Sequence, residues 1–185
     1  MRTFTKEQLA EIVKKHGQWL RSEAGGERAD LSNAYLSYVD FDKAYLGGSN
    51  FSYSDLRGSN LSNSDLSYAD LSHAILKHAD LKYVNLYGAC MRGACLSNVS
   101  LQWALGNMSH VKSILIDTYH ITYTRDALFI GCKGFPISAW WSFSEDQIRE
   151  MNGEDAVVWW RKYKSLIQQA VTLSPAEATT QEDEQ

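Results

Sequence analysis

Large apolar residues recur at every fifth position between residues 29 and 103. Divided into fives from Ala29, this segment contains fifteen consecutive units with no insertion. The third position of every unit is Leu, Phe or Met, and the first is always Ala, Ser or Val. An amphipathic helix needs apolar spacings of three and four, and a half-buried strand needs a spacing of two. A period of five fits neither, so the pattern predicts a repeat architecture.

A square coil has this period if each five-residue unit forms one side. The large third residue then points to the axis, the small first residue points inward near the corner, and the other three positions face water. Successive coils stack through backbone hydrogen bonds at the ~4.8 Å spacing of β-strands. No unit buries its apolar residue alone, so the stability comes from stacking. We therefore predict an all-β solenoid over residues 29–105.

The repeated pattern, with units such as ADLSN, SDLSY and ADLKY, resembles the A(D/N)LXX signature of the pentapeptide-repeat family. The resemblance implies a right-handed quadrilateral β-helix, and the handedness is carried over from the family. It implies little about activity, because a shared fold does not fix function.

The segments on both sides of the repeat are predicted to cover its open ends, because exposed strand edges invite aggregation. Residues 1–28 are expected to form an N-terminal helical cap, with a helix over 6–20 that begins after Thr5. Residues 106–173 are predicted to contain strands around 113–131, a short helix ending near Gly153 and a longer amphipathic helix. The strands are expected either to extend the β-helix or to form a terminal hairpin. Residues 174–185 are expected to form a disordered acidic tail.

The longer helix, over residues 154–172, has too many apolar residues for one narrow stripe. We expect it to act both as a helical cap and as a homodimer contact. The tryptophan pairs Trp140-Trp141 and Trp159-Trp160 are interpreted as packing against the end of the rod. The residues assigned to the dimer contact are Trp159, Trp160 and Tyr163.

The two ends of the chain also resemble those of pentapeptide-repeat proteins of tailed phages and prophages. The matching N-terminal residues are His16, Trp19, Leu20 and the run 28–31 (RADL). The matching C-terminal residues are the run 130–132 (IGC) and the two tryptophan pairs. This resemblance implies a phage origin and no particular mechanism.

The charge of the chain argues against direct binding to nucleic acid. The formal net charge is −4, and four acidic residues without a basic one lie in the last eleven positions. The repeat itself has seven acidic and five basic residues, so it lacks the basic excess of a phosphate-backbone binder. The chain has no apolar run long enough to span a bilayer, and it begins with a charged segment. We expect no membrane contact and a cytoplasmic location, in a bacterial host if the protein is phage-encoded.

No set of residues forms a complete catalytic or metal-binding constellation. His73 and His78 lie at outward positions without the further ligands that a metal site needs. Cys90, Cys95 and Cys132 include no CxxC pair and are expected to be reduced thiols. We therefore predict that the protein is not an enzyme and has no catalytic residue, cofactor or metal.

Tyrosines are the residues that most favour a binding function. They occupy outward positions of the repeat, where Ser, Asn or Gly would serve equally well, and exposed tyrosine on a rigid surface is typical of recognition sites. The alternative is scattered surface aromatics, which are normal. The residues predicted to bind a partner are Tyr35, Tyr38, Tyr45, Tyr53, Tyr68, Tyr83 and Tyr87.

Three functions remain open at this stage. The first is a phage-type binding or inhibitor protein that engages a host or phage protein, with a host defence system as the natural target. The second is a DNA mimic that modulates a DNA-binding enzyme such as gyrase, as the family resemblance implies. The third is a small-molecule binder with a pocket between the rod and the C-terminal segment, around Trp140.

Overall fold

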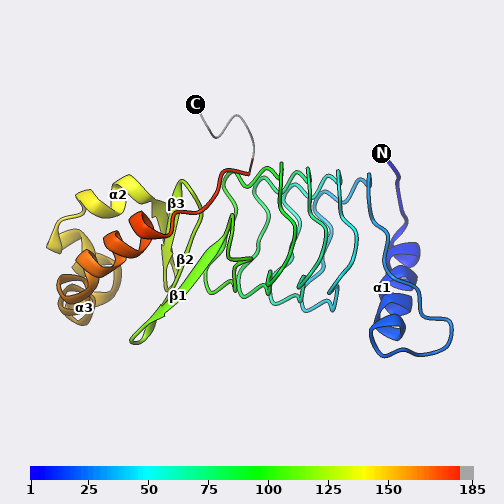
Figure 1. The fold of residues 1–185 in the computed structure, drawn as a ribbon, viewed down its shortest axis with the longest axis horizontal. Helices are drawn as coiled ribbons and strands as arrows, with labels where there is room; N and C mark the ends of the chain where they lie inside the picture. Colours follow the sequence, from blue (N-terminus) through cyan, green and yellow to red (C-terminus); the bar gives the residue numbers. More distant parts are fainter. Residues whose placement is uncertain (180–185) are drawn as a thin grey trace.

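The computed structural model describes residues 1–179 and contains one elongated solenoid with a different structure at each end (Figure 1). Helix α1 (Lys6–Leu20) lies at the N-terminal end. Strands β1 (Lys112–Ile116), β2 (Tyr119–Tyr123), β3 (Ala127–Ile130) and β4 (Lys133–Pro136) follow the solenoid. Helices α2 (Ile137–Ser142) and α3 (Glu145–Leu173) lie beyond the sheet. No helix within the described residues is long and apolar enough to cross a membrane.

The predicted five-residue register is confirmed by the bridges between successive coils. From Asp30–Asn50 to Asn85–Leu105, each bridge is parallel and joins residues twenty positions apart. Twenty residues are four units of five, so each unit forms one of four sides, and residues twenty apart stack on the same side. Figure 1 shows the coils stacked along the long axis of the molecule.

The third-position side chains fill the axis of the solenoid. Fourteen of the fifteen are buried, and Leu66 at mid-rod has no exposed surface. Serine is tolerated at the inward first position because its hydroxyl donates to a backbone carbonyl. Ser49 donates to the Leu46 carbonyl at 2.6 Å, and Ser59 donates to the Leu56 carbonyl at 2.8 Å. These bonds satisfy buried hydroxyls that would otherwise be costly.

Each corner of the coil is a turn with its fifth-position residue in the left-handed region. All fifteen of these residues have a positive φ, from Asn33 at 51° to Gly93 at 74°. A turn of this kind needs a positive φ at its third residue, which explains the glycines and asparagines there. Aromatic residues occupy several of the same positions, although bulky side chains adopt this conformation at a cost.

Helix α1 lies across the first coil, where it begins with the capping box that Thr5 predicts. Leu9, Ile12 and Val13 pack against the solenoid core. Buried His16 accepts a hydrogen bond on Nδ1 from the backbone N–H of Ala29 at 3.0 Å. Burial lowers the pKa of His16, which favours the neutral imidazole that this bond requires.

The strands predicted around 113–131 are present as β1, β2 and β3. The C-terminal end differs from the prediction of a helical cap, because the sheet that contains these strands lies against the rod instead. The four strands form an antiparallel sheet in the order β1-β2-β3-β4, and β4 was not foreseen. Phe129 belongs to the solenoid core, whereas Ile121 and Leu128 belong to a second core with α2 and α3. The helices therefore pack on the outer face of the sheet and not on the rod.

The tryptophan pairs belong to this second core. Trp140, Trp159 and Trp160 are buried there, and Trp141 stacks on Trp160 with ring centroids 6.1 Å apart. Their packing role was predicted, but their partner is the sheet. Helix α3 has non-helical backbone angles at Asn152 and Gly153, in agreement with the predicted break near Gly153.

The last described residues return to the solenoid, in contrast to the expected disordered tail. Ser174 accepts a hydrogen bond from the Tyr123 hydroxyl at 2.8 Å, and Ala176 is buried. Glu177 N–H donates to the Ser109 carbonyl at 3.0 Å, and the Thr179 carbonyl accepts from Gly93 N–H. Apolar burial and backbone pairing hold this segment, so it is not a tail. Residues 180–185 of the predicted tail lie outside the described residues.

Candidate functional site

One side of the solenoid concentrates the aromatic residues. It contains the column Tyr45, Asp65, Asn85 and Leu105, which stack by parallel bridges. The turns at its two margins contribute Tyr83 and Trp103 on one side and Tyr68 and Tyr87 on the other. We call this side the tyrosine face, and define it by Tyr45, Tyr68, Tyr83, Tyr87, Trp103 and Leu105.

All seven tyrosines predicted from the sequence are exposed, with relative exposures between 51% and 83%. Four of them, Tyr45, Tyr68, Tyr83 and Tyr87, share the tyrosine face. The other three do not join them: Tyr35 and Tyr38 lie on the opposite side of the coil, and Tyr53 lies at another corner. Sequence reasoning missed Trp103 and Leu105, although their places twenty residues after Tyr83 and Asn85 would have shown them.

Ring contacts hold the aromatic side chains in place. Tyr83 stacks on Trp103 with centroids 6.2 Å apart, and Trp103 stacks on His120 of β2 at 5.8 Å. Tyr68 meets Tyr87 edge to face at 5.6 Å. Such pairs are favourable arrangements of aromatic rings. These contacts fix the positions of Tyr68, Tyr83, Tyr87 and Trp103 before any partner arrives.

Charge is nearly absent from the central column of this face. Asp65 is its one charged residue, and its Oδ1 accepts hydrogen bonds from Ser67 N–H at 2.9 Å and Asn85 Nδ2 at 3.0 Å. The carboxylate is thus engaged by its own coil and the next. A surface of fixed aromatic rings, small residues and few charges suits association with another macromolecule.

The histidine and cysteine candidates are not brought together. His73 stacks on Tyr53 with centroids 4.7 Å apart, and His78 lies at the next corner along the chain. Cys90, Cys95 and Cys132 are free thiols. Among residues 1–179, no cluster of three or more His, Cys, Asp or Glu side chains is arranged for a metal ion.

The residues assigned to a dimer contact require a correction. Trp159 is 7% exposed and Trp160 is 4% exposed, because both pack in the second core. Neither side chain is free to meet another copy of the chain. Tyr163 is partly buried, with its ring 5.2 Å from that of Trp159. The exposed apolar residues of α3 are instead Val158, Leu166 and Leu173.

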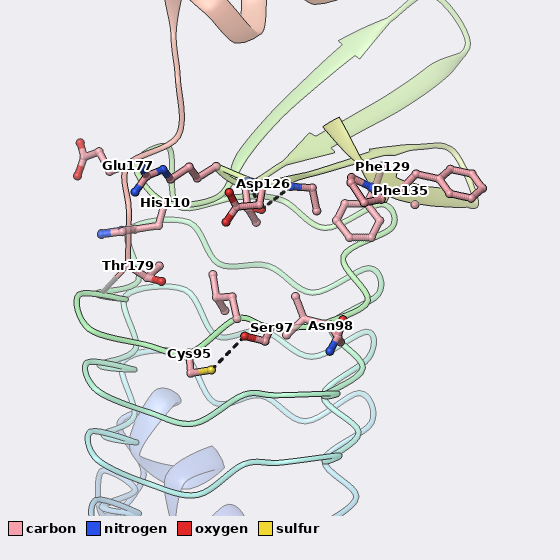
Figure 2. Close-up of a pocket in the computed structure, with 16 residues that line it drawn as sticks. Cys95, Ser97, Asn98, His110, Asp126, Phe129, Phe135, Glu177 and Thr179 are labelled. Atoms are coloured by element: carbon pink, nitrogen blue, oxygen red, sulfur yellow. Dashed lines mark hydrogen bonds between the residues drawn. The ribbon is translucent and has the colours of Figure 1, made fainter. Parts of the chain in front are cut away.

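A groove of about 660 Å³ lies between the last coil and the C-terminal segment (Figure 2). Its floor is the unit 94–98, and the β2–β3 turn with Asp126 lies above it. Phe129 and Phe135 line one end, and Thr179 lies at the other. Burial lowers the pKa of His110 beside it, which the nearby Glu177 carboxylate opposes.

The small-molecule pocket expected around Trp140 is only about 50 Å³ in volume. That is far below the size of typical ligand pockets. The space between the rod and the C-terminal segment is therefore real, but it lies over the unit 94–98 and away from the tryptophans.

The fold defines the protein as a β-helical solenoid built from five-residue units. The sequence pattern of pentapeptide repeats matches residues 27–63 and 59–98, so this part of the chain belongs to the pentapeptide-repeat family. Members of this family form right-handed quadrilateral β-helices. No curated protein matches the chain.

Several solved structures resemble the chain over part of its length. A pentapeptide repeat protein (Rfr23) from the cyanobacterium Cyanothece 51142 is 32% identical, over 42% of this chain and 56% of its own, with a TM-score of 0.28. The protein alr5209 from Nostoc Pcc 7120 is 32% identical, over 51% of this chain and 75% of its own, with a TM-score of 0.29. QnrB1, a plasmid-mediated fluoroquinolone resistance protein, is 23% identical, over 45% of this chain and 50% of its own, with a TM-score of 0.24. The chain thus spans between half and three quarters of the length of these relatives.

Proposed function

We propose that this protein is a non-enzymatic binding protein that holds a protein partner on the tyrosine face. The observation that carries the proposal is the grouping of Tyr45, Tyr68, Tyr83 and Tyr87, all more than half exposed, on one side of a rigid rod. Tyrosine and tryptophan are enriched among the residues that contribute most to protein interfaces. Rings already fixed by stacking lose little side-chain entropy on binding, which favours affinity.

The finer function is an inhibitor of phage type that acts in a bacterial cytoplasm on a host protein, with a component of a defence system as the target. The resemblance of the chain ends to phage proteins supports this step. DNA mimicry of the gyrase-modulating kind has less support. The seven acidic and five basic residues of the repeat are spread over all four sides, and no side has a net charge greater than one. Duplex DNA has about one negative charge per 1.7 Å of its axis.

A matched pair of variants tests the role of the tyrosine face. Tyr45 and Tyr35 both occupy the second position of their units in the first coil, on opposite sides, and are 72% and 54% exposed. The variant of the tyrosine face is the double substitution Tyr45→Ser/Tyr87→Ser. The control on the opposite side is the single substitution Tyr35→Ser. Partners are captured from bacterial lysate with each variant and quantified by mass spectrometry.

We expect a partner recovered with the wild-type protein and with Tyr35→Ser to be lost with Tyr45→Ser/Tyr87→Ser. Two aromatic contacts at an interface centre are worth at least about 2 kcal/mol together, or roughly thirtyfold in affinity. Equal recovery by all three proteins would show that the tyrosine face is not the binding site.

A further inference from the structure

The last coil has an open backbone edge on the side opposite the tyrosine face. One coil lower on this side, Leu76 N–H donates to the Cys95 carbonyl at 2.9 Å and His78 N–H donates to the Ser97 carbonyl at 3.1 Å. Cys95 N–H donates to the Ala74 carbonyl at 2.9 Å. The equivalent groups of the last coil are Leu96 N–H, Asn98 N–H and the Ala94 carbonyl. Within residues 1–179, none of these three groups has a hydrogen-bond partner.

The side chain of Leu96 shows the same missing layer. It is the one third-position residue of the fifteen that is not buried. Every other leucine of this kind is covered by the coils above and below it or by an end structure. Leu96 lines the groove instead, so an apolar side chain lies beside the unpaired N–H groups of Leu96 and Asn98, whereas the Ala94 carbonyl belongs to a residue with no exposed surface.

On two of the other three sides of the last coil, the chain supplies partners at the corresponding positions. Gly93 N–H donates to the Thr179 carbonyl, and the Ala89 carbonyl accepts from Asn107 Nδ2 at 3.1 Å. The Ala104 carbonyl accepts from the Thr122 hydroxyl at 3.1 Å. Within the described residues, the chain thus supplies substitutes for the next coil on two sides and none on the sides 94–98 and 99–103. Of these two, only the side 94–98 has a third-position residue, Leu96, that is not buried. Unpaired backbone groups beside apolar surface are costly unless water or a partner satisfies them.

We propose that the groove binds an extended, uncharged peptide segment of a protein partner, which adds the next unit to the solenoid. The stacking on this side, Tyr35–Asp55–Ile75–Cys95, fixes its register. The carbonyl of the peptide residue that stacks on Cys95 accepts from Leu96 N–H. The carbonyl two residues later accepts from Asn98 N–H. The residue between them points inward and buries its apolar side chain on Leu96 and Phe129. Strand addition of this kind gains affinity from main-chain hydrogen bonds and specificity from alternate side chains.

The C-terminal residues 180–185 are a poor occupant on chemical grounds. Their sequence, TQEDEQ, contains three acidic residues and no apolar residue, so it cannot cover Leu96. A peptide from another protein is therefore the occupant that the groove favours. This proposal is independent of the tyrosine face, which lies on the opposite side.

Amide hydrogen exchange followed by NMR tests the proposal with internal controls. In the full-length protein, Leu96 and Asn98 amides are expected to exchange at least about a hundredfold faster than those of Leu76 and His78, which have the same place one coil lower and are hydrogen-bonded. A chain ending at Thr179 should give the same rates. Equal protection of the two pairs, or protection that disappears with the truncation, would overturn the proposal.

The probe is a synthetic seven-residue peptide with the sequence of residues 33–39 (NAYLSYV), capped at both ends. Its addition should slow exchange of Leu96 and Asn98, and should also slow alkylation of Cys95 in the groove while Cys132 reacts at its usual rate. The same peptide with an alkene in place of the peptide bond after the residue that stacks on Cys95 lacks the carbonyl that accepts from Leu96 N–H. It should bind about tenfold more weakly, the cost of one hydrogen bond.

Two protein variants complete the experiment. Leu96→Ala should weaken peptide binding by about tenfold through lost apolar contact, and Leu115→Ala, at an exposed leucine of β1 that does not line the groove, should leave it unchanged. Equal binding of the alkene peptide and the unmodified peptide would show a groove that accepts apolar ligands by shape alone, which contradicts strand addition. Absence of any peptide effect at millimolar concentration would also overturn the proposal.

Discussion

The second position of each unit shows how single residues shape the repeat. Asp or Asn at this position accepts a hydrogen bond from the backbone N–H two residues later, as Asp40 does from Asp42 at 3.1 Å. This local bond fixes the turn that follows. In three of the four columns Asp also stacks on Asn and not on another Asp, and Asn60 Nδ2 donates to Asp40 Oδ1 at 2.8 Å. The alternation avoids stacking two carboxylates at the spacing of neighbouring strands. The aspartates that a DNA mimic would present are thus structural acceptors.

Asp55 differs from the other aspartates because it is 1% exposed. Its Oδ1 accepts from Arg57 Nε at 2.8 Å, and this side-chain bond is the main reason why its pKa falls to about 2. The folded pKa lies below the unfolded value of about 3.9. The ionised form therefore stabilises the fold above pH ~4, and this contribution is lost as the pH falls through about 2.

We expect Asp55→Asn to lower the free energy of unfolding at pH 7 by up to about 2 kcal/mol. It should also flatten the pH dependence of stability between about pH 4 and pH 2. The control is Asp40→Asn, at an exposed position with the same turn bond and no arginine partner. Urea unfolding at a series of pH values measures the free energy of unfolding of both variants and its pH dependence. Parallel pH profiles of stability for Asp55→Asn and the wild type would contradict a lowered pKa of Asp55 in the folded protein.

Glycine at the corners is required where an aromatic ring of the coil below covers it. A Cβ atom at Gly88 would lie 2.7 Å from the Tyr68 ring, whereas one at Gly48 would lie 3.6 Å from Trp19. Both glycines have positive φ, 68° and 72°. Gly48→Ala therefore introduces only the backbone strain of a positive φ, whereas Gly88→Ala must also displace the Tyr68 ring.

We expect Gly88→Ala to destabilise the protein by about 1 kcal/mol more than Gly48→Ala, because the Tyr68 contacts are lost. In the Tyr68→Ala background the difference should disappear. Thermal unfolding of the two glycine variants, each in the wild-type and in the Tyr68→Ala background, measures this difference in stability. An equal loss for both glycine variants would show that the ring swings away at no cost.

At the scale of elements, the solenoid, the helix starts and the strands around 113–131 could be predicted from the sequence, whereas strand β4 and the place of the sheet between the rod and the helices could not. A period of five with a large residue at each third position admits few structures, and the capping boxes at Thr5 and Ser144 are local signals. Strand β4 contains Gly134 and ends at Pro136, residues that ordinarily indicate a turn. Its pairing with β3 depends on contacts that no local pattern shows. The same holds for the groove, which exists because the sheet leaves one side of the last coil uncovered.

Leu66→Lys is expected to prevent folding of the solenoid. Leu66 is fully buried on the axis, and a lysine there would bury a charge without a partner, at a cost greater than about 4 kcal/mol. The control is Leu115→Lys in β1, where the leucine is 68% exposed. Circular dichroism and thermal melting distinguish the two. A soluble Leu66→Lys protein with a cooperative transition would overturn the five-residue register.

At the scale of the whole molecule, the two cores share one sheet and leave an apolar stripe on α3 without a partner. Val158, Leu166 and Leu173 are 57%, 48% and 83% exposed. Their spacings of eight and seven residues place them within one stripe of the helix. The buried tryptophans cannot mediate the dimer predicted from the sequence, so any contact between copies through α3 must use this stripe. Exposed apolar stripes commonly mark association, and two-fold dimers are the commonest soluble oligomers.

We therefore predict a weak homodimer through α3, with a dissociation constant of tens of micromolar, in line with a contact of a few leucine-sized side chains. Leu166→Glu should abolish it, because two like charges would meet at the two-fold axis. Leu115→Glu, at an exposed leucine away from α3, should leave it intact. Light scattering across a range of concentrations measures the mass of each protein. A monomer mass for the wild type at hundreds of micromolar would rule out the dimer, and a dimer that survives Leu166→Glu would place its contact elsewhere on the molecule.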